Sequence, residues 1–565
     1  MMKHLTNVDC FPDKAQYLEG EVVTILLEAE DTQHLIEIEF TVSELDRIII
    51  RKIVQPSELI AGDIVYKLSC ELPVGNYGVD VKVSYVDDVI VVHTACDVVE
   101  SYSSSIRYGF LADFSEQEKE DSSDINFAVK LHLNTLQFYD WMYRHDKLVA
   151  DEEEYCEPLG RILSLQTIRN KVNLCKQHGI RPFAYGAVYA ASKEAYTEHP
   201  SWALYKQDGG VLSFADWLVF MDTSNDAPWC NYIIEQYADT VKRLGFQGIH
   251  MDTYGFPKHV YNDKHERISL AETFPGMIKL AKQAVKKIDD KAGVIFNAVN
   301  NWPIEYVAAS EQDAAYIEVW APHVTYHHLY TLIREAKYLG AKQVILAAYM
   351  KPFLEAKTEE EILAAELSLL LTNAVIQASG GSQLVFGETN SALSDSYYVN
   401  YSSLREEFIS KVRAYCDFAV RYGKLLYDKA IMDISMTAAN GINEDIVFRT
   451  SQGSNIEFTS DGEAGKVWTI IREAKQYLTV QLINLTNIND LWNQPKRNRP
   501  EPVSCIEIDM LADIDIKGVF LASPDDEAGV PIRLEYEIEQ RSNGKHIIFA
   551  VPKLDLWNLI WVELS

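Results

Sequence analysis

The spacing of apolar and polar residues divides the chain into three stretches, and the first has the period of β-strands. Between about residues 10 and 100, short runs alternate apolar with polar side chains and end at turn residues. The clearest runs are residues 22–27, 35–40, 79–85 and 88–92. Such a series of short strands predicts an immunoglobulin-like β-sandwich over residues 1–103, with packing and spacing as its expected role.

From residue 107 the pattern changes to short apolar runs that alternate with amphipathic helical segments. The expected strands are residues 108–112, 135–139, 182–189, 247–252, 293–297, 314–319, 343–349 and 383–387. The expected helices are residues 165–177, 231–243, 273–287, 326–338, 360–378 and 404–421. Eight strand–helix units over about 320 residues match the number and length of a (β/α)8 barrel, which we assign to residues 104–424.

After residue 424 the helical period ends and strand-like runs return at residues 446–448, 467–471, 478–485 and 545–551. These runs predict a C-terminal antiparallel β-sandwich over residues 425–565. The fold class is therefore multidomain α/β and all-β, with a central barrel between two β-sandwiches.

Composition and charge narrow the choice of partners. The hydrophobic fraction of 47% and the charged fraction of 24% are those of an ordinary globular protein. The formal net charge of −31 argues against nucleic acid and anionic membrane surfaces, because phosphate groups are repelled. The 31 Tyr and 10 Trp offer ring faces of the kind that neutral sugars bind. Nothing in the pattern indicates an oligomeric state.

The N-terminal residues contain no apolar run long enough for a signal peptide, and no later stretch approaches the length of a membrane helix. The eight Cys have no metal-ligand spacing, which is typical of buried reduced thiols. These features favour the cytoplasm, although a protein whose leader had been removed would look the same and would be secreted. We expect neither a metal nor a cofactor, because phosphate loops are absent and His327 and His328 lack spaced partners.

Two expected barrel strands end in a carboxylate beside an aromatic residue. The fourth ends in Asp252, followed by Thr253 and Tyr254, and the sixth ends in Glu318, two residues before Trp320. Because the ends of parallel barrel strands share one rim, the two acids can approach to about 5 to 5.5 Å, as retaining glycosidases require. A single acid at such a position is as readily a rim salt bridge or a helix cap, but two together favour catalysis.

Residues 245–252 and 316–320 resemble the nucleophile and acid/base segments of glycoside hydrolase family 66, the dextranases and cycloisomaltooligosaccharide glucanotransferases. Residues 137–145 are similar to the family's loop after strand two, and this is the most specific match. Residues 384–388 and 482–492 are similar to its last strand and C-terminal sandwich. The resemblance covers residues from about 10 to 565.

The resemblance implies endo-acting cleavage of α-1,6-linked glucans with net retention, with Asp252 as nucleophile and Glu318 as general acid and then base. It also implies a set of residues around the sugar subsites: Asp140, Trp141, His145, Tyr189, Asn297, Trp320 and Glu388. Two of these have structural alternatives. His145 can be a loop histidine held by a neighbouring carboxylate, and Trp320 can be an interstrand packing residue.

Departures from the family pattern favour the dextranase branch. The glucanotransferases carry a carbohydrate-binding module after strand seven, whereas here residues 349–353 lead directly into a helix that opens near residue 358. The Thr253-Tyr254 pair and the missing leader point to imported isomaltooligosaccharides as the substrate. Two alternatives stay open: a transglycosylating glucanotransferase, and a non-catalytic glucan-binding protein, which acids more than about 10 Å apart would favour.

Overall fold

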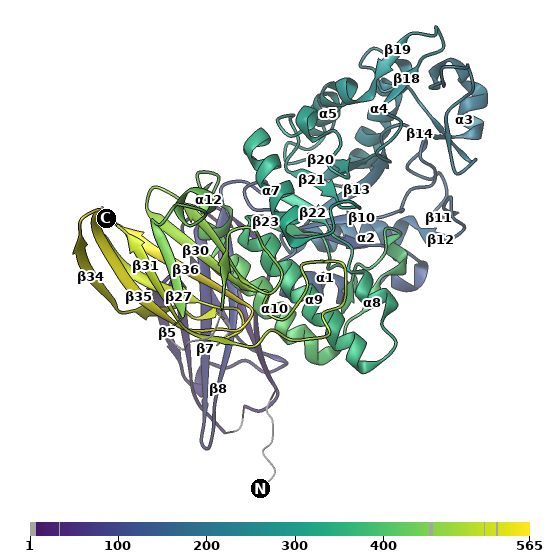
Figure 1. Ribbon diagram of the computed structural model, residues 1–565. Coiled ribbons are helices and arrows are strands. Elements are labelled where there is room, and N and C mark those ends of the chain that lie inside the picture. The colour runs from purple at the N-terminus through teal and green to yellow at the C-terminus, as the bar shows by residue number, and fades with distance from the viewer. Residues whose placement is uncertain (1–6, 33, 451–455, 513–514, 527–528) are drawn as a thin grey trace.

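The structure is a computed structural model that describes residues 7–32, 34–450, 456–512, 515–526 and 529–565. A mixed α/β region occupies the middle of the chain, and the first and last parts are built from β-sheets (Figure 1). The purple N-terminal strands and the yellow C-terminal strands both lie on one side of the central region. The hairpin β18–β19 and the strand β14 lie on the opposite side of the central region.

The N-terminal part consists of two sheets, with strand orders β1-β3-β6 and β2-β8-β7-β4-β5. Alternate residues such as Ile25, Phe40 and Val79 fill one apolar core, so the predicted alternation is confirmed. The immunoglobulin-like topology and the boundary at residue 103 stay predictions. The strands are β1 Val8–Pro12, β2 Tyr17–Leu18, β3 Val22–Ala29, β4 Leu35–Glu44, β5 Arg47–Val54, β6 Ile64–Glu71, β7 Gly75–Tyr85 and β8 Val89–Val99.

The barrel sheet has eight parallel strands in the order β23-β22-β21-β20-β17-β13-β10-β9, and seven of them lie where the sequence predicted. The eighth, β23, shares only Gln383 with the strand expected at residues 383–387. The Phe110 N–H donates to the Phe386 carbonyl oxygen at 3.3 Å and brings the two edges of the sheet together. A side chain at Gly387 would place its Cβ 2.0 Å from the Phe110 carbonyl oxygen, so this approach requires glycine. The strands are β9 Tyr108–Leu111, β10 Thr135–Phe138, β13 Arg181–Ala187, β17 Gly248–Asp252, β20 Gly293–Val299, β21 Ala315–Glu318, β22 Val344–Ala347 and β23 Gly381–Gln383.

The six predicted helices are confirmed, with small shifts at their ends. Helix α4 ends at Gly245, which has a left-handed φ of 79° and caps the helix. The shorter helices α1, α3, α6, α8 and α11 were not among the predicted helices. The helices of this region are α1 Ser123–Lys130, α2 Leu165–Gln177, α3 Lys193–Glu198, α4 Pro228–Leu244, α5 Leu270–Lys286, α6 Ile304–Val307, α7 Tyr326–Gly340, α8 Lys351–Glu355, α9 Glu359–Ala378, α10 Glu406–Arg421 and α11 Gly423–Tyr427.

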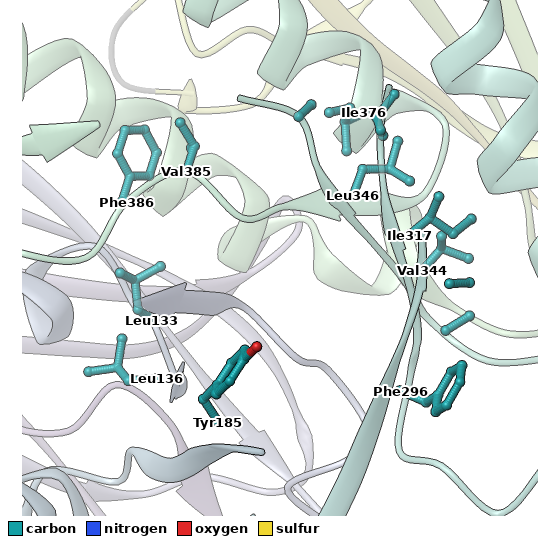
Figure 2. Packing of buried hydrophobic residues seen from close by; sticks show 14 of the residues in the cluster. Leu133, Leu136, Tyr185, Phe296, Ile317, Val344, Leu346, Ile376, Val385 and Phe386 are labelled. Carbon is teal, nitrogen blue, oxygen red and sulfur yellow. The ribbon is translucent and has the colours of Figure 1, made fainter. Parts of the chain in front are cut away.

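Helix α9 corrects one expectation, because by length and composition alone it is sufficient to cross a membrane. However, 83% of its apolar window is buried inside the protein. Figure 2 shows Ile376 of α9 close to Leu346 of β22 and Ile317 of β21. The apolar character of α9 is therefore that of a core helix packed on the sheet.

The strands alternate between two apolar clusters, and this alternation decides which side chains enter the barrel. Phe296, Ile317 and Leu346 belong to the large cluster that includes residues of the surrounding helices (Figure 2). Their neighbours Ile295 and Tyr316 belong to a separate cluster inside the barrel. Asn297 follows Ile295 by two positions, and Glu318 follows Tyr316 by two positions. Because side chains alternate along a strand, Asn297 and Glu318 also point into the barrel.

Small sheets extend the loops that follow the C-terminal ends of the barrel strands. Such loops form the pocket in barrels of this kind. The strands are β11 Glu154–Cys156, β12 Ile162–Ser164, β14 Ala190–Ser192, β15 Ser213–Phe214, β16 Leu218–Phe220, β18 His259–Tyr261, β19 Arg267–Ser269, β24 Ser391–Ala392 and β25 Ser402–Ser403.

The C-terminal part contains a seven-stranded sheet and a four-stranded sheet, and most neighbouring strands are antiparallel. Ile471, Leu482 and Ile508 lie in the core between them. The boundary at residue 424 stays a prediction. The elements are β26 Met432–Asp433, α12 Ser435–Ala438, β27 Ile446–Thr450, β28 Phe458–Thr459, β29 Val467–Glu473, β30 Tyr477–Asn484, β31 Val503–Leu511, β32 Ile516–Ala522, β33 Ile532–Leu534, β34 Tyr536–Arg541, β35 Gly544–Leu554 and β36 Trp557–Leu564.

Candidate active site

The two strand-end acids meet at one amide. Asp252 ends β17, Glu318 ends β21, and β20 lies between these strands. The Asn297 Nδ2 group of β20 donates to Asp252 Oδ1 at 2.7 Å and to Glu318 Oε2 at 3.0 Å. These two carboxylate oxygens are therefore no further apart than the sum of the two distances, about 5.7 Å. Asp252, Asn297 and Glu318, all predicted site residues, form one cluster.

Two tyrosines hold the remaining carboxylate oxygens, and sequence reasoning assigned neither of them to the site. Tyr185 donates its hydroxyl to Asp252 Oδ2 at 2.8 Å, and Tyr349 donates to Glu318 Oε1 at 2.8 Å. Tyr185 lies two residues before Ala187, which is the partner of Asp252 in the sheet register. An alternation count along each strand, rather than its last residues alone, would have identified Tyr185.

Burial raises the pKa of both acids, and for Asp252 the charge of Glu318 adds to it. Burial and, second, the nearby charge of Glu318 raise the pKa of Asp252 to about 7. Hydrogen bonds from Asn297 and Tyr185 act in the opposite direction but are weaker. Burial also raises the pKa of Glu318, although hydrogen bonds to this carboxylate, including one from Trp320, act to lower it. Two close carboxylates resist joint ionisation, so the pair holds a proton to a higher pH than a free carboxylic acid does.

Aromatic rings line the space next to the acids. Tyr139 stacks on Tyr398 with ring centroids 4.2 Å apart, and Trp320 lies 5.7 Å from the Tyr349 ring. Tyr139 and Trp320 are only half-buried, so each keeps part of its surface exposed. Trp320 packs against a neighbouring ring, as one of its two sequence interpretations expected, and it also hydrogen-bonds Glu318. Its role as a platform for sugar stays a prediction.

Asp140 and His145 follow β10 on the same side of the barrel, and both are buried. Asp140 has a left-handed φ of 46°, and burial raises its pKa to about 7 although Arg161 opposes the shift. His145 lies beside the rings of Tyr185 and Trp217, and burial lowers its pKa to about 4. Within the described part of the chain no carboxylate lies within 4.0 Å of its ring nitrogens, so the carboxylate-held alternative is not observed.

Trp141 and Tyr189 are placed behind the site rather than at its surface. Trp141 has 0% exposure and donates its indole N–H to the Tyr185 carbonyl oxygen at 3.2 Å. Tyr189 is equally buried, donates to the Phe256 carbonyl oxygen and accepts the Tyr254 N–H. In this structure these residues position Tyr185 and the loop after β17, and the sugar contact expected of them is not available.

Glu388 is also turned away from the two acids. One of its oxygens accepts the backbone N–H groups of Ala112 and Asp113, so it ties the end of β9 to the last barrel segment. Burial, together with the nearby charge of Asp124, raises its pKa to about 8. Its carboxylate therefore serves the closure of the sheet in this structure, not a sugar subsite.

One group of acids in the described residues has the spacing of a metal site: Glu118, Asp121 and Asp124. Asp124 already pairs with the buried Lys171, whose ammonium group compensates its charge. This pairing explains the position of Asp124 without an ion.

Comparisons with known proteins agree with this geometry. The model of glycosyl hydrolase family 66 matches residues 12–561. A cycloisomaltooligosaccharide glucanotransferase of Niallia circulans is 23% identical over 83% of this chain and 62% of its own length. A dextranase of Streptococcus salivarius is 23% identical over 61% of this chain and 47% of its own length. The chain thus spans less than two thirds of both of these relatives.

Among solved structures, a cycloisomaltooligosaccharide glucanotransferase of Paenibacillus sp. in complex with cycloisomaltoheptaose has the same fold. Its TM-score is 0.87 at 20% identity, over 98% of this chain and 99% of that one. Because the family model spans nearly the whole chain, the resemblance seen in the sequence is confirmed. The chain belongs to glycosyl hydrolase family 66.

Proposed function

We propose that this chain is a retaining, endo-acting glycosidase that cleaves α-1,6-glucosidic linkages of dextran or isomaltooligosaccharides. The observation that carries the proposal is the bridge of Asn297 between Asp252 and Glu318. The limit of about 5.7 Å between the bridged oxygens suits the separation of about 5 to 5.5 Å in retaining enzymes, and inverting enzymes need about 6.5 to 9.5 Å. A non-catalytic glucan-binding protein would have no need to hold two buried acids so close.

In the proposed mechanism Glu318 protonates the glycosidic oxygen while Asp252 attacks the anomeric carbon. Glu318 then removes a proton from water, which displaces the sugar from Asp252 and restores both acids. Each N–H of Asn297 bonds one carboxylate, so this amide keeps the nucleophile and the acid in register on opposite sides of the bond. Tyr185 supports the negative charge on Asp252 between turnovers.

The substrate assignment rests on the family and on the rings beside the acids. The relatives named above are a dextranase and glucanotransferases that make or bind cycloisomaltooligosaccharides. Tyr139 and Trp320 offer half-exposed rings next to the reacting carboxylates, and sugar C–H faces pack on such rings. No charged side chain is required for a neutral glucan, which agrees with a wall of aromatic residues.

Transglycosylation is the second candidate, because glucanotransferases cover more of this chain than the dextranase does. Both reactions pass through the same sugar ester of Asp252 and differ in whether water or a sugar hydroxyl attacks it. The short connection from β22 through α8 to α9 favours hydrolysis, since it lacks the inserted module expected of the glucanotransferase branch.

The test is incubation of the full chain with dextran, pullulan and short isomaltooligosaccharides, followed by product sizing and NMR of the first anomer released. We expect dextran and isomaltooligosaccharides to be cut to a range of linear products with retained α configuration. Release of the β anomer would contradict the retaining mechanism, and failure to cut any α-1,6-linked substrate would contradict the assignment. Cyclic products would favour the glucanotransferase.

A further inference from the structure

A cavity of about 710 Å³ lies at the opposite end of the barrel from Asp252. Its lining includes Gln343 and Ser379, which directly precede β22 and β23, and the last turns of α7. The loop before β26 and Arg472 of β29 complete the wall, so the cavity lies between the barrel and the C-terminal part. Nothing in the proposed glycosidase mechanism uses it.

The charge of this cavity is opposite to that of the protein. Its basic lining residues are Arg334, Lys337, Lys342, Lys429 and Arg472, and its acidic ones are Glu335 and Asp433. The chain as a whole carries a net charge of −31. A concentration of cations in one concave, partly desolvated place attracts anions, because burial weakens the screening by water.

The two acids of the lining are already engaged elsewhere. Glu335 accepts the side-chain N–H of Asn301 at 2.8 Å, and Asp433 accepts the backbone N–H of Ser435 at 3.1 Å. Lys342 is likewise held, because it donates to backbone carbonyl groups. Asp433 and Asp428 attract Lys337 and Arg472 from a longer distance, but in the described part of the chain neither cation forms a direct ion pair.

Lys337 and Arg472 lie next to each other. A Cβ built at Gly380 would be 2.9 Å from Lys337 Nζ and 2.8 Å from Arg472 Nη2, so these nitrogens are no further apart than about 5.7 Å. Within the described ranges no carboxylate lies within 4.0 Å of either. Burial and the charge of Arg472 lower the pKa of Lys337 to about 7.

The hydrogen bonds that Arg472 makes within the protein leave some of its N–H donors free for a ligand. Its Nη1 and Nη2 groups donate to the carbonyl oxygens of Ala378 and Leu426, near the ends of α9 and α11. Guanidinium has five N–H donors, and its planar fork suits phosphate oxygens. Tyr427 and Ile431 add apolar surface to the same cavity. The site thus offers two adjacent cations beside a wall that can cover an organic group.

We propose that this cavity binds a phosphate monoester, with the phosphate between Lys337 and Arg472 and the organic group against Tyr427 and Ile431. The phosphate supplies the negative charge that the two cations lack. Its oxygens accept from the ammonium group and from the guanidinium at once, as paired Lys and Arg residues do in phosphate sites.

The experiment is isothermal titration calorimetry of the full chain with glucose 6-phosphate, inorganic phosphate and glucose at constant ionic strength. We expect glucose 6-phosphate to bind more tightly than inorganic phosphate, and glucose not to bind at this site. Lys337→Gln should weaken glucose 6-phosphate binding at least tenfold. Lys286→Gln is the matched control, because this exposed lysine occupies the last turn of α5 at the same end of the barrel.

Cleavage of isomaltooligosaccharides should be unchanged in Lys337→Gln, which separates this proposal from the glycosidase assignment. Equal affinity of the wild type and Lys337→Gln for glucose 6-phosphate would overturn the site. Binding of glucose as tight as that of glucose 6-phosphate would also overturn it, because recognition would then reside in a sugar cleft. The proposal would also be overturned if glucose 6-phosphate produced no binding heat and did not raise the melting temperature of the protein.

Discussion

Two regions of the molecule, the rim of the barrel and the contact between the N-terminal sheet and α10, place an aspartate in opposite electrostatic settings. At the C-terminal ends of the strands, Asp252 shares the Asn297 amide with a second acid, Glu318. Where the N-terminal sheet packs on α10, Arg421 donates to both oxygens of Asp80 at 2.9 and 3.0 Å. The barrel rim therefore pairs an acid with an acid, and the contact at α10 pairs an acid with a cation.

The pKa values of the two aspartates follow from this difference. Burial would raise the pKa of Asp80, but His93 and Arg421 outweigh it and lower the pKa to about 2. Burial and Glu318 together raise the pKa of Asp252 to about 7. The ion pair near α10 therefore stabilises a contact between two parts of the chain. The two close acids at the barrel rim instead serve the proposed reaction, and they lower the stability of the folded protein.

Removing either acid at the rim should have the largest effect on activity. Asp252→Asn and Glu318→Gln each lack a group that forms or breaks a bond, so we expect cleavage of isomaltooligosaccharides to fall by about a thousandfold or more. Reducing-sugar release measures it, and circular dichroism checks the fold. A variant that retains close to the wild-type rate would refute the assignment of that acid.

Breaking the pair near α10 should have the largest effect on stability. Arg421→Met leaves Asp80 partly buried beside His93 alone, and loss of one partner of a buried pair costs about 3 to 5 kcal/mol in the free energy of unfolding. Urea unfolding at pH 7 measures the change. Arg51→Met, at an exposed pair with Glu39 on the same sheet, is the control and should leave the midpoint almost unchanged. Equal midpoints for the two variants would show that the Arg421 contact contributes nothing.

The third prediction concerns a smaller effect, the direction in which the stability contribution of Asp252 changes with pH. The folded-state pKa of Asp252, about 7, lies above its ordinary value of 3.8, so its contribution to stability is fully present below pH 3.8 and is lost as the pH rises to about 7. Asp252→Asn removes this loss, and its melting temperature should exceed that of the wild type by more at pH 8 than at pH 5. An advantage that shrinks with rising pH would contradict the raised pKa.

The barrel was predictable because its signals are local. Each strand is a short apolar run, and helix ends carry their own marks, such as the left-handed Gly245 after α4 and the Thr358 capping box before α9. The positions of Asp252 and Glu318 at strand ends follow from the same pattern. Helix α1 escaped prediction because it is short and only eight residues carry its signal.

The roles of the neighbouring side chains were not predictable in the same way. Trp141 and Tyr185 are both buried aromatic residues, yet the first bonds the backbone of the second, and only the second holds Asp252. Glu388 follows the last strand as a catalytic acid could, but its oxygen caps the loop after β9. Composition and spacing do not distinguish these environments, because exposure depends on what other strands place in front of a side chain.

The sequence by itself determined the order of elements, the family and the two acids, since apolar period, turn residues and strand-end carboxylates are properties of neighbouring positions. Only the tertiary structure decided that Asn297 stands between the acids and that Lys337 lies next to Arg472 in the wall of a cavity. The physical reason is that alternation fixes the side to which a residue points, whereas the register of strands and the packing of distant parts fix what it meets.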